Sequence, residues 1–213
     1  SPVVFRLLKK ISKCSNLIVV SGRPESFLKE RLRGIDCDMA FEHGALYFDR
    51  SQNKVRNLVS TNKSKWYSEA LKIIQSYKNR TPNSIIEKKN YSIAWHFRNS
   101  PSDYGEFQGR NLVSDLRGCF QGLPVSVILG KKVVEIKSSE ANKGRFLEWY
   151  LDRNLEEGSV LFAAGDDRTD EDMFEVLRDK GITLKIGRDP KTKAQFFLEN
   201  QTDIQKILES LFL

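Results

Sequence analysis

An acidic loop in the last third of the chain carries residues that could bind a metal ion. The segment Gly165-Asp-Asp-Arg-Thr-Asp-Glu-Asp-Met-Phe174 places Asp166 and Asp167 next to each other, directly after the apolar run 158–164. Such a run is typical of a buried strand in a parallel sheet, and open α/β sheets bind ligands at the carboxyl ends of these strands. Carboxylates are hard oxygen ligands, and one or two of them with a phosphate can hold Mg²⁺. We therefore expect Asp166 to bind a metal ion.

Part of this acidity has a simpler explanation. Thr169 could cap a helix, and acidic residues such as 170–172 complement the helix dipole in its first turn. Capping does not explain two adjacent carboxylates, Asp166 and Asp167, one residue past a strand. A metal role for Asp166 therefore remains the better explanation.

Two further segments could bind an anion. Ser21 follows the apolar run 17–20 and precedes Gly22 and a helix start, so its hydroxyl and the neighbouring backbone N–H groups can contact negative charge. Lys143 opens a later helix and can supply a positive charge to a phosphate. Each signal is weak alone, because both types of sequence occur at many helix entries.

The elements that would position these residues alternate between helix and strand. This alternation predicts an α/β fold with a doubly wound parallel sheet. The expected elements outside the middle of the chain are a helix at 3–13, a strand at 17–20, a helix with Pro24 as its first residue, a strand at 39–42, a hairpin at 46–58, a helix at 143–151, strands at 158–164 and 182–186, and a helix at 202–212.

The middle of the chain follows a different order, in which a helix and two strands occur twice. These strands alternate in polarity and lack the continuous apolar runs of a parallel sheet. We interpret residues 61–137 as an inserted α+β domain, with 1–60 and 138–213 forming the α/β core. The expected elements of the insertion are helices at 66–77 and 102–120 and strands at 85–89, 91–97, 124–129 and 132–137.

Composition excludes several classes of protein. The 213 residues carry a net charge of +7, but 35 basic residues are dispersed among 28 acidic ones, which disfavours nucleic-acid binding. No apolar run approaches the ~18 residues of a membrane span, and no signal peptide opens the chain. Cys14, Cys37 and Cys119 are too few and too widely spaced for a disulfide framework or a zinc site. A cytoplasmic location is expected, without a membrane or nucleic-acid partner.

The order of the serine, the lysine and the acidic loop around an insertion resembles three of the four signatures of haloacid-dehalogenase-type phosphatases. The resemblance extends to trehalose-6-phosphate phosphatases and to the phosphatase domains of trehalose-phosphate-synthase-like proteins, and it covers nearly the whole chain. The segments that carry it are Glu42-His-Gly44, Glu87-Lys-Lys-Asn-Tyr-Ser-Ile-Ala-Trp-His-Phe-Arg98, Tyr104-Gly-Glu-Phe-Gln108 and Gly165 to Phe174.

This resemblance implies a Mg²⁺-dependent phosphatase that releases trehalose and phosphate from trehalose 6-phosphate, with the insertion acting as a cap. Ser21 and Lys143 would hold the transferring phosphoryl group, and Arg23 would lie near the sugar phosphate. Asp166 would bind Mg²⁺ directly, and Asp167 or Asp170 would support the metal site from the next layer of residues. The cap residues implied to hydrogen-bond the glucose hydroxyls are Glu87, Lys89, Arg98, Lys131 and Glu135.

The charged residues of the insertion also have a structural explanation. Glu87, Lys89, Glu135 and Lys137 fall on alternating strand positions, so they could form cross-strand ion pairs on an exposed sheet face. For Lys89 and Lys131 the two explanations are equally compatible with the sequence.

The two histidines and one tryptophan of these segments are expected to be structural. His43 would fix the backbone where the chain leaves the core, and His96 would lie on a face of a cap strand. Trp95 would belong to the core of the cap instead of forming a stacking platform for substrate.

The first signature of the resembled family, Asp-x-Asp-Gly-Thr, is absent. Its two aspartates act as nucleophile and as general acid–base. The one Asp-x-Asp outside the acidic loop, Asp36-Cys-Asp38, follows a turn instead of an apolar strand and comes after Ser21, so we reject it. In the family this signature follows a strand that is central in the sheet. A sheet without that strand would leave buried backbone groups unpaired, each costing ~1–3 kcal/mol. We therefore expect the nucleophile to lie upstream of Ser1.

A second hypothesis is a regulatory module that binds a sugar phosphate without turnover. Its partner would be a trehalose-phosphate synthase domain or subunit. A natural N-terminal segment without the two aspartates would favour this hypothesis. Retention of Ser21, Lys143 and Asp166 favours the phosphatase.

Overall fold

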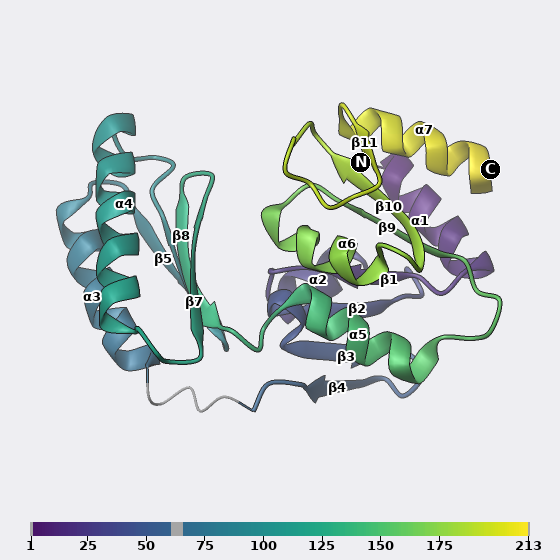
Figure 1. Cartoon of the computed structure of the whole chain (residues 1–213), viewed down its shortest axis with the longest axis horizontal. Coiled ribbons are helices and arrows are strands. Elements are labelled where there is room, and N and C mark those ends of the chain that lie inside the picture. The colour runs from purple at the N-terminus through teal and green to yellow at the C-terminus, as the bar shows by residue number, and fades with distance from the viewer. Residues whose placement is uncertain (1, 61–65, 213) are drawn as a thin grey trace. The chain divides into compact units, whose positions relative to one another are not determined.

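The computed structural model describes residues 2–60 and 66–212, which form two compact units (Figure 1). The first unit contains Ser1–Leu58 and Asn142–Leu213, and the second contains Val59–Ala141. The second unit thus spans the range in which the sequence predicted an insertion. The predicted first residues of that insertion, 61–65, lie outside the described residues.

The first unit contains two separate sheets. In one, β1 and β2 are parallel, and β3 and β4 continue as an antiparallel hairpin. In the other, β9, β10 and β11 are all parallel. The strands are β1 (Ile18–Val20), β2 (Asp38–Phe41), β3 (Leu46–Asp49), β4 (Lys54–Asn57), β9 (Leu161–Gly165), β10 (Gly181–Ile186) and β11 (Phe196–Leu198).

The helices of this unit are α1 (Pro2–Cys14), α2 (Glu25–Arg31), α5 (Lys143–Asn154), α6 (Glu171–Leu177) and α7 (Gln201–Phe212). None of the described helices is long and apolar enough to cross a membrane. The predicted α/β class with parallel sheet is confirmed. The strand β11 was not predicted, because Phe196–Leu198 is too short to show a periodic pattern.

The strands β1 and β9 are edge strands of their sheets, each with one side unpaired among the described residues. Both border a single apolar cluster. Val20 of β1 and Ala163 of β9 pack against this cluster, whose buried members include Leu147 of α5 and Met173 of α6. The carboxyl ends of the two strands are therefore supported by the same pair of helices.

Local sequence determines where the helices near these strand ends begin. Asn142 caps α5, since its side-chain oxygen accepts a hydrogen bond from the backbone N–H of Arg145 at 3.0 Å. Pro24 precedes α2 in an extended conformation instead of being its first residue. The predicted cap Thr169 is also wrong: it lies inside a short 3₁₀ turn, Arg168–Asp170, which Asp167 precedes.

The second unit is an antiparallel sheet covered by two helices. Its strand order is β5-β6-β8-β7, and neighbouring strands are antiparallel throughout. Trp95, Ile93 and Ile136 of the sheet pack against Ile74 and Leu112 of the helices in one apolar core. The elements are α3 (Tyr67–Arg80), β5 (Ile85–Lys88), β6 (Ser92–His96), α4 (Ser102–Cys119), β7 (Val125–Gly130) and β8 (Val133–Ser138).

Candidate active site

Ser21 lies in a loop that is fixed by backbone hydrogen bonds on both sides. Its N–H donates to the Ala40 carbonyl at 2.9 Å, and its carbonyl accepts from the N–H of His43 at 2.9 Å. The N–H of Arg23 donates to the Ser21 hydroxyl oxygen at 3.2 Å, while the Arg23 carbonyl accepts from the N–H of Glu42 at 3.1 Å. The loop Ser21-Gly-Arg23 is therefore held against the turn that follows β2.

That turn has an unusual backbone. Glu42, His43 and Gly44 have φ angles of 48°, 61° and 90°. Left-handed conformations of residues other than glycine cost of order 1 kcal/mol each and are retained where the surroundings enforce them. The His43 ring lies so close to Gly22 that a Cβ there would be 2.4 Å from His43 Cε1. This agrees with the expected role of His43 in fixing the backbone and adds a contact with the Ser21 loop.

Lys143 and Asp170 form a buried ion pair in the first unit. Lys143 Nζ lies 2.6 Å from Asp170 Oδ1, and the two side chains are 5% and 6% exposed. Asp170 Oδ2 accepts a hydrogen bond from the N–H of Asp167 at 2.9 Å. A Cβ at Gly165 would lie 2.4 Å from the Asp170 carboxyl carbon, so only glycine fits there. The first residue of α5 is thereby joined directly to the acidic loop.

Asp166 and Asp167 lie at the carboxyl end of β9 with exposed side chains. Within the described residues, the Asp166 carboxylate has no hydrogen-bond or ion-pair partner. The backbone of the loop is held by Lys185 of β10, whose Nζ donates to the carbonyls of Asp166 at 2.7 Å and Asp167 at 3.3 Å. Lys185 was missed by the sequence analysis, since it occurs inside the apolar strand β10; a lysine in such a strand was the available signal.

The loop has part of a Mg²⁺ donor set. Asp166 offers a free, exposed carboxylate with Asp167 beside it, and Mg²⁺ is commonly held by one or two carboxylates and a substrate phosphate. Both oxygens of Asp170 are already engaged, by Lys143 and by the backbone of Asp167. Among residues 2–60 and 66–212, no group of three or more His, Cys, Asp or Glu side chains could hold a metal ion.

The predicted glucose-binding residues on the strands of the second unit form contacts with one another. Lys89 Nζ lies 2.9 Å from Glu135 Oε1, with side chains 7% and 14% exposed, and the Ser92 hydroxyl donates to the same oxygen at 2.7 Å. Glu87 Oε2 lies 2.8 Å from His96 Nε2. Glu87 and Glu135 share the sheet face opposite the apolar core. The cross-strand pairs expected as an alternative are thus present for Lys89 and Glu135.

Arg98 and Lys131 are exposed and lie in turns at one end of this sheet. The backbone N–H of Phe97 donates to the Lys132 carbonyl at 3.0 Å, which places the two turns side by side. Lys137 is buried instead, and its ammonium donates to the Ala141 carbonyl. Trp95 is fully buried in the core of the unit, as expected.

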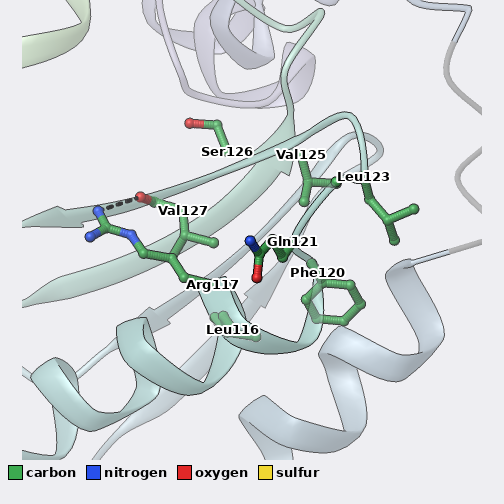
Figure 2. A pocket seen from close by; sticks show the side chains of 9 residues that line it. Leu116, Arg117, Phe120, Gln121, Leu123, Val125, Ser126 and Val127 are labelled. Carbon is green, nitrogen blue, oxygen red and sulfur yellow. Dashed lines mark hydrogen bonds between the residues drawn. The ribbon is translucent and has the colours of Figure 1, made fainter.

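The second unit also has a pocket of about 370 Å³ between the end of α4 and β7 (Figure 2). Arg117 borders it and donates to the Val127 carbonyl at 3.3 Å, on the edge strand of the sheet. None of the predicted site residues lines this pocket. The residues expected to do chemistry or bind substrate are therefore separate from it.

With this geometry established, comparison with known proteins identifies the family. Residues 1–202 match the trehalose-phosphatase family. The chain belongs to this family. It is 31% identical over 202 residues to "Alpha,alpha-trehalose-phosphate synthase [UDP-forming] B" of Dictyostelium discoideum, an alignment that covers 93% of this chain and 25% of that protein.

Solved structures confirm the fold. The C-terminal domain of Candida albicans trehalose-6-phosphate phosphatase matches with a TM-score of 0.89 at 24% identity, covering 99% of this chain and 83% of that one. A haloacid dehalogenase-like hydrolase from Bacteroides thetaiotaomicron matches with a TM-score of 0.72 at 13% identity, covering 100% and 92%. The fold is thus like that of a haloacid dehalogenase-like hydrolase, as the sequence resemblance implied. The chain spans about a quarter of the length of the Dictyostelium relative.

Proposed function

We propose that this protein is a Mg²⁺-dependent phosphatase that hydrolyses trehalose 6-phosphate to trehalose and phosphate through an aspartyl-phosphate. The observation that carries the proposal is the buried pair of Lys143 and Asp170, which joins a helix N-terminus to the loop bearing the free Asp166 carboxylate. A catalytic apparatus for phosphate needs positive charge and a metal ligand on a rigid support. Membership of the trehalose-phosphatase family supports the substrate.

The nucleophile would come from a strand upstream of Ser1. The unpaired sides of β1 and β9, which border one apolar cluster, support the placement of a strand between them. An aspartate at the end of that strand would attack phosphorus, and the phosphorus–sugar oxygen bond would break. A second aspartate would give the leaving oxygen its proton, and would then take a proton from the water that hydrolyses the aspartyl-phosphate.

The residues of the first unit would act on the phosphoryl group. The Ser21 hydroxyl and the Lys143 ammonium would hydrogen-bond its oxygens, and Arg23 would lie near the sugar phosphate. Asp166 and Asp167 would hold Mg²⁺, with Asp170 fixing the loop instead of binding the ion directly. When bound, Mg²⁺ would neutralise charge on the phosphoryl oxygens. These roles follow from the resemblance. They fit the exposure of Asp166 and Asp167 and the engagement of both Asp170 oxygens by other groups.

The second unit would bind the sugar as a cap. Its proposed contacts to the glucose hydroxyls use charged groups that make strong hydrogen bonds and penalise substrates that leave them unpaired. Fixing Lys89 and Glu135 before the substrate arrives would reduce the entropy lost on binding. The residues of this proposed surface are Glu87, Lys89, Arg98, Lys131 and Glu135.

The test is phosphate release from trehalose 6-phosphate by the full-length protein with Mg²⁺. Asp166→Ala should lower kcat by about a thousandfold or more, because the metal contributes several kcal/mol to transition-state stabilisation. Asp179→Ala removes another exposed carboxylate of the same unit and serves as the matched control. Equal rates for wild type and Asp166→Ala would overturn the assignment of the acidic loop.

A second candidate is a regulatory domain that binds trehalose 6-phosphate without turnover and has a trehalose-phosphate synthase domain or subunit as its partner. The match to a Dictyostelium protein named as a synthase favours it. Calorimetric binding of trehalose 6-phosphate by full-length protein that releases no phosphate would support this candidate. Rapid release of phosphate would exclude it.

A further inference from the structure

Lys185 is a buried lysine whose ammonium is fully occupied by the acidic loop and its neighbours. Its side chain is 5% exposed, and it lies on β10, the central strand of its sheet. An ammonium group has three N–H donors. Lys185 Nζ contacts three acceptors: the carbonyl of Asp166 at 2.7 Å, that of Asp167 at 3.3 Å, and Glu171 Oε1 at 3.4 Å.

The partners of Lys185 show what the interaction constrains. Burying a charge is costly unless it is paired and hydrogen-bonded, so an apolar residue would be the cheaper choice at this position of β10. Two of the three partners are main-chain carbonyls, which belong to the successive peptide groups after Asp166. Fixing both peptide planes fixes the backbone torsions of Asp167 and the direction in which the loop leaves Asp166.

Glu171 extends the same network to a second loop. Its carboxylate accepts hydrogen bonds from the Thr192 hydroxyl at 3.0 Å and from the backbone N–H of Lys193 at 2.7 Å. Lys185 thus lies between the acidic loop and an anchored carboxylate. The loop cannot move away from β10 without breaking the charge-assisted hydrogen bonds of Lys185, and such bonds are stronger than those between neutral groups.

We propose that Lys185 is a positioning residue that holds the Asp166–Asp167 backbone in the conformation required for a divalent cation before the cation binds. This rests on the metal site of the proposed function. A buried ion pair with a merely structural role would affect the stability of the fold, whereas a positioning residue also determines metal affinity in protein that is already folded.

The experiment measures Mn²⁺ binding to the full-length protein by loss of the free-ion EPR signal. Lys185→Met should raise the Kd for Mn²⁺ by about 10- to 100-fold, the usual effect of removing a group that orients a metal ligand. Lys185→Gln, which retains two N–H donors without the charge, should give a smaller increase. Thr192→Val is the matched control, because it removes a Glu171 contact and leaves the carbonyl contacts of Lys185 intact; its Kd should stay within about twofold of wild type.

Thermal unfolding in excess EDTA shows whether each variant is folded. A folded Lys185→Met with wild-type Mn²⁺ affinity would overturn the proposal. If Lys185→Met does not fold, Lys185→Gln decides by the same criterion, and wild-type Mn²⁺ affinity in folded Lys185→Gln would overturn the proposal. Wild type that binds Mn²⁺ but releases no phosphate would refute the proposed function alone, whereas active wild type with an unaffected Lys185→Met would refute the positioning role alone.

Discussion

The buried charge pair of the second unit lies on one continuous four-stranded sheet, whereas the buried charge pair of the first unit joins a helix to a loop in a unit with two separate sheets. Lys89 and Glu135 lie on one face of the sheet β5-β6-β8-β7, and a single apolar core packs against the opposite face. Lys143 and Asp170 belong to a unit in which β1 and β9 each end a sheet. The sheet of the second unit is continuous, but in the first unit β1 and β9, which are edge strands of two different sheets, border one apolar cluster.

The first unit would depend on the proposed upstream strand, whereas the sheet of the second unit is continuous. An unpaired edge buried in a fold costs free energy for each unsatisfied group. The open sides of β1 and β9 lie beside the loops that carry Ser21 and Asp166, so the strand proposed to complete the sheet is also the proposed source of the nucleophile. Stability and chemistry of the first unit would then depend on the same segment.

The largest expected effect is on folding of the isolated units. A fragment of residues 59–141 should unfold cooperatively by near-UV circular dichroism, because its core is complete and its ends meet where Ser60 binds Glu140. A chain joining residues 1–58 to 142–213 without the upstream segment should lack a cooperative transition. Adding that segment should restore one. A cooperative transition in the joined chain without it would refute the dependence.

The next effect separates stability from chemistry within the first unit. Lys143→Met leaves the Asp170 carboxylate buried and unpaired, which should lower the free energy of unfolding by about 3–5 kcal/mol. Lys143→Met combined with Asp170→Asn should recover part of this loss in urea denaturation, since no buried charge remains. Phosphate release should stay low in both variants. Recovery of activity in the double variant would show that Lys143 acts only through Asp170.

The strand ends could be predicted from the sequence, but the interactions between them could not. Apolar runs revealed β1 and β9 and so placed Ser21 and Asp166 at strand ends. The pairing of Lys143 with Asp170 spans 27 residues and has no local signature. Lys185 was missed because it occurs in an apolar strand, and which side chains of such a strand are buried depends on tertiary packing. The left-handed turn at His43 also escaped, because only its last residue is a glycine.

A smaller effect is expected for the pair in the second unit. Lys89→Ala should raise the KM for trehalose 6-phosphate by about 10- to 100-fold with little change in kcat, since a charge-assisted hydrogen bond contributes roughly 1.5–3 kcal/mol and these residues lie in the proposed cap. The exposed Lys88 lies next to Lys89 on the sequence, so Lys88→Ala is a matched control. A fall in kcat alone would contradict a role limited to substrate binding.

The smallest effect concerns the reactivity of the cysteines, which reports on the packing of the first unit without changing it. Burial, followed by the negative charges of Asp38 and Asp36, raises the pKa of Cys37 to about 11. At pH 8 only about a thousandth of this thiol would be ionised, and thiolates are the reactive form.

Cys14 and Cys119 are exposed. Labelling with a maleimide followed by mass spectrometry should therefore modify these two first and leave Cys37 unmodified until the first unit unfolds. Cys14 of the first unit and Cys119 of the second are both exposed, so their labelling rates should be similar under native conditions. Rapid labelling of Cys37 in folded protein would show that the first unit opens even when its sheet is complete, which the proposed upstream strand should prevent.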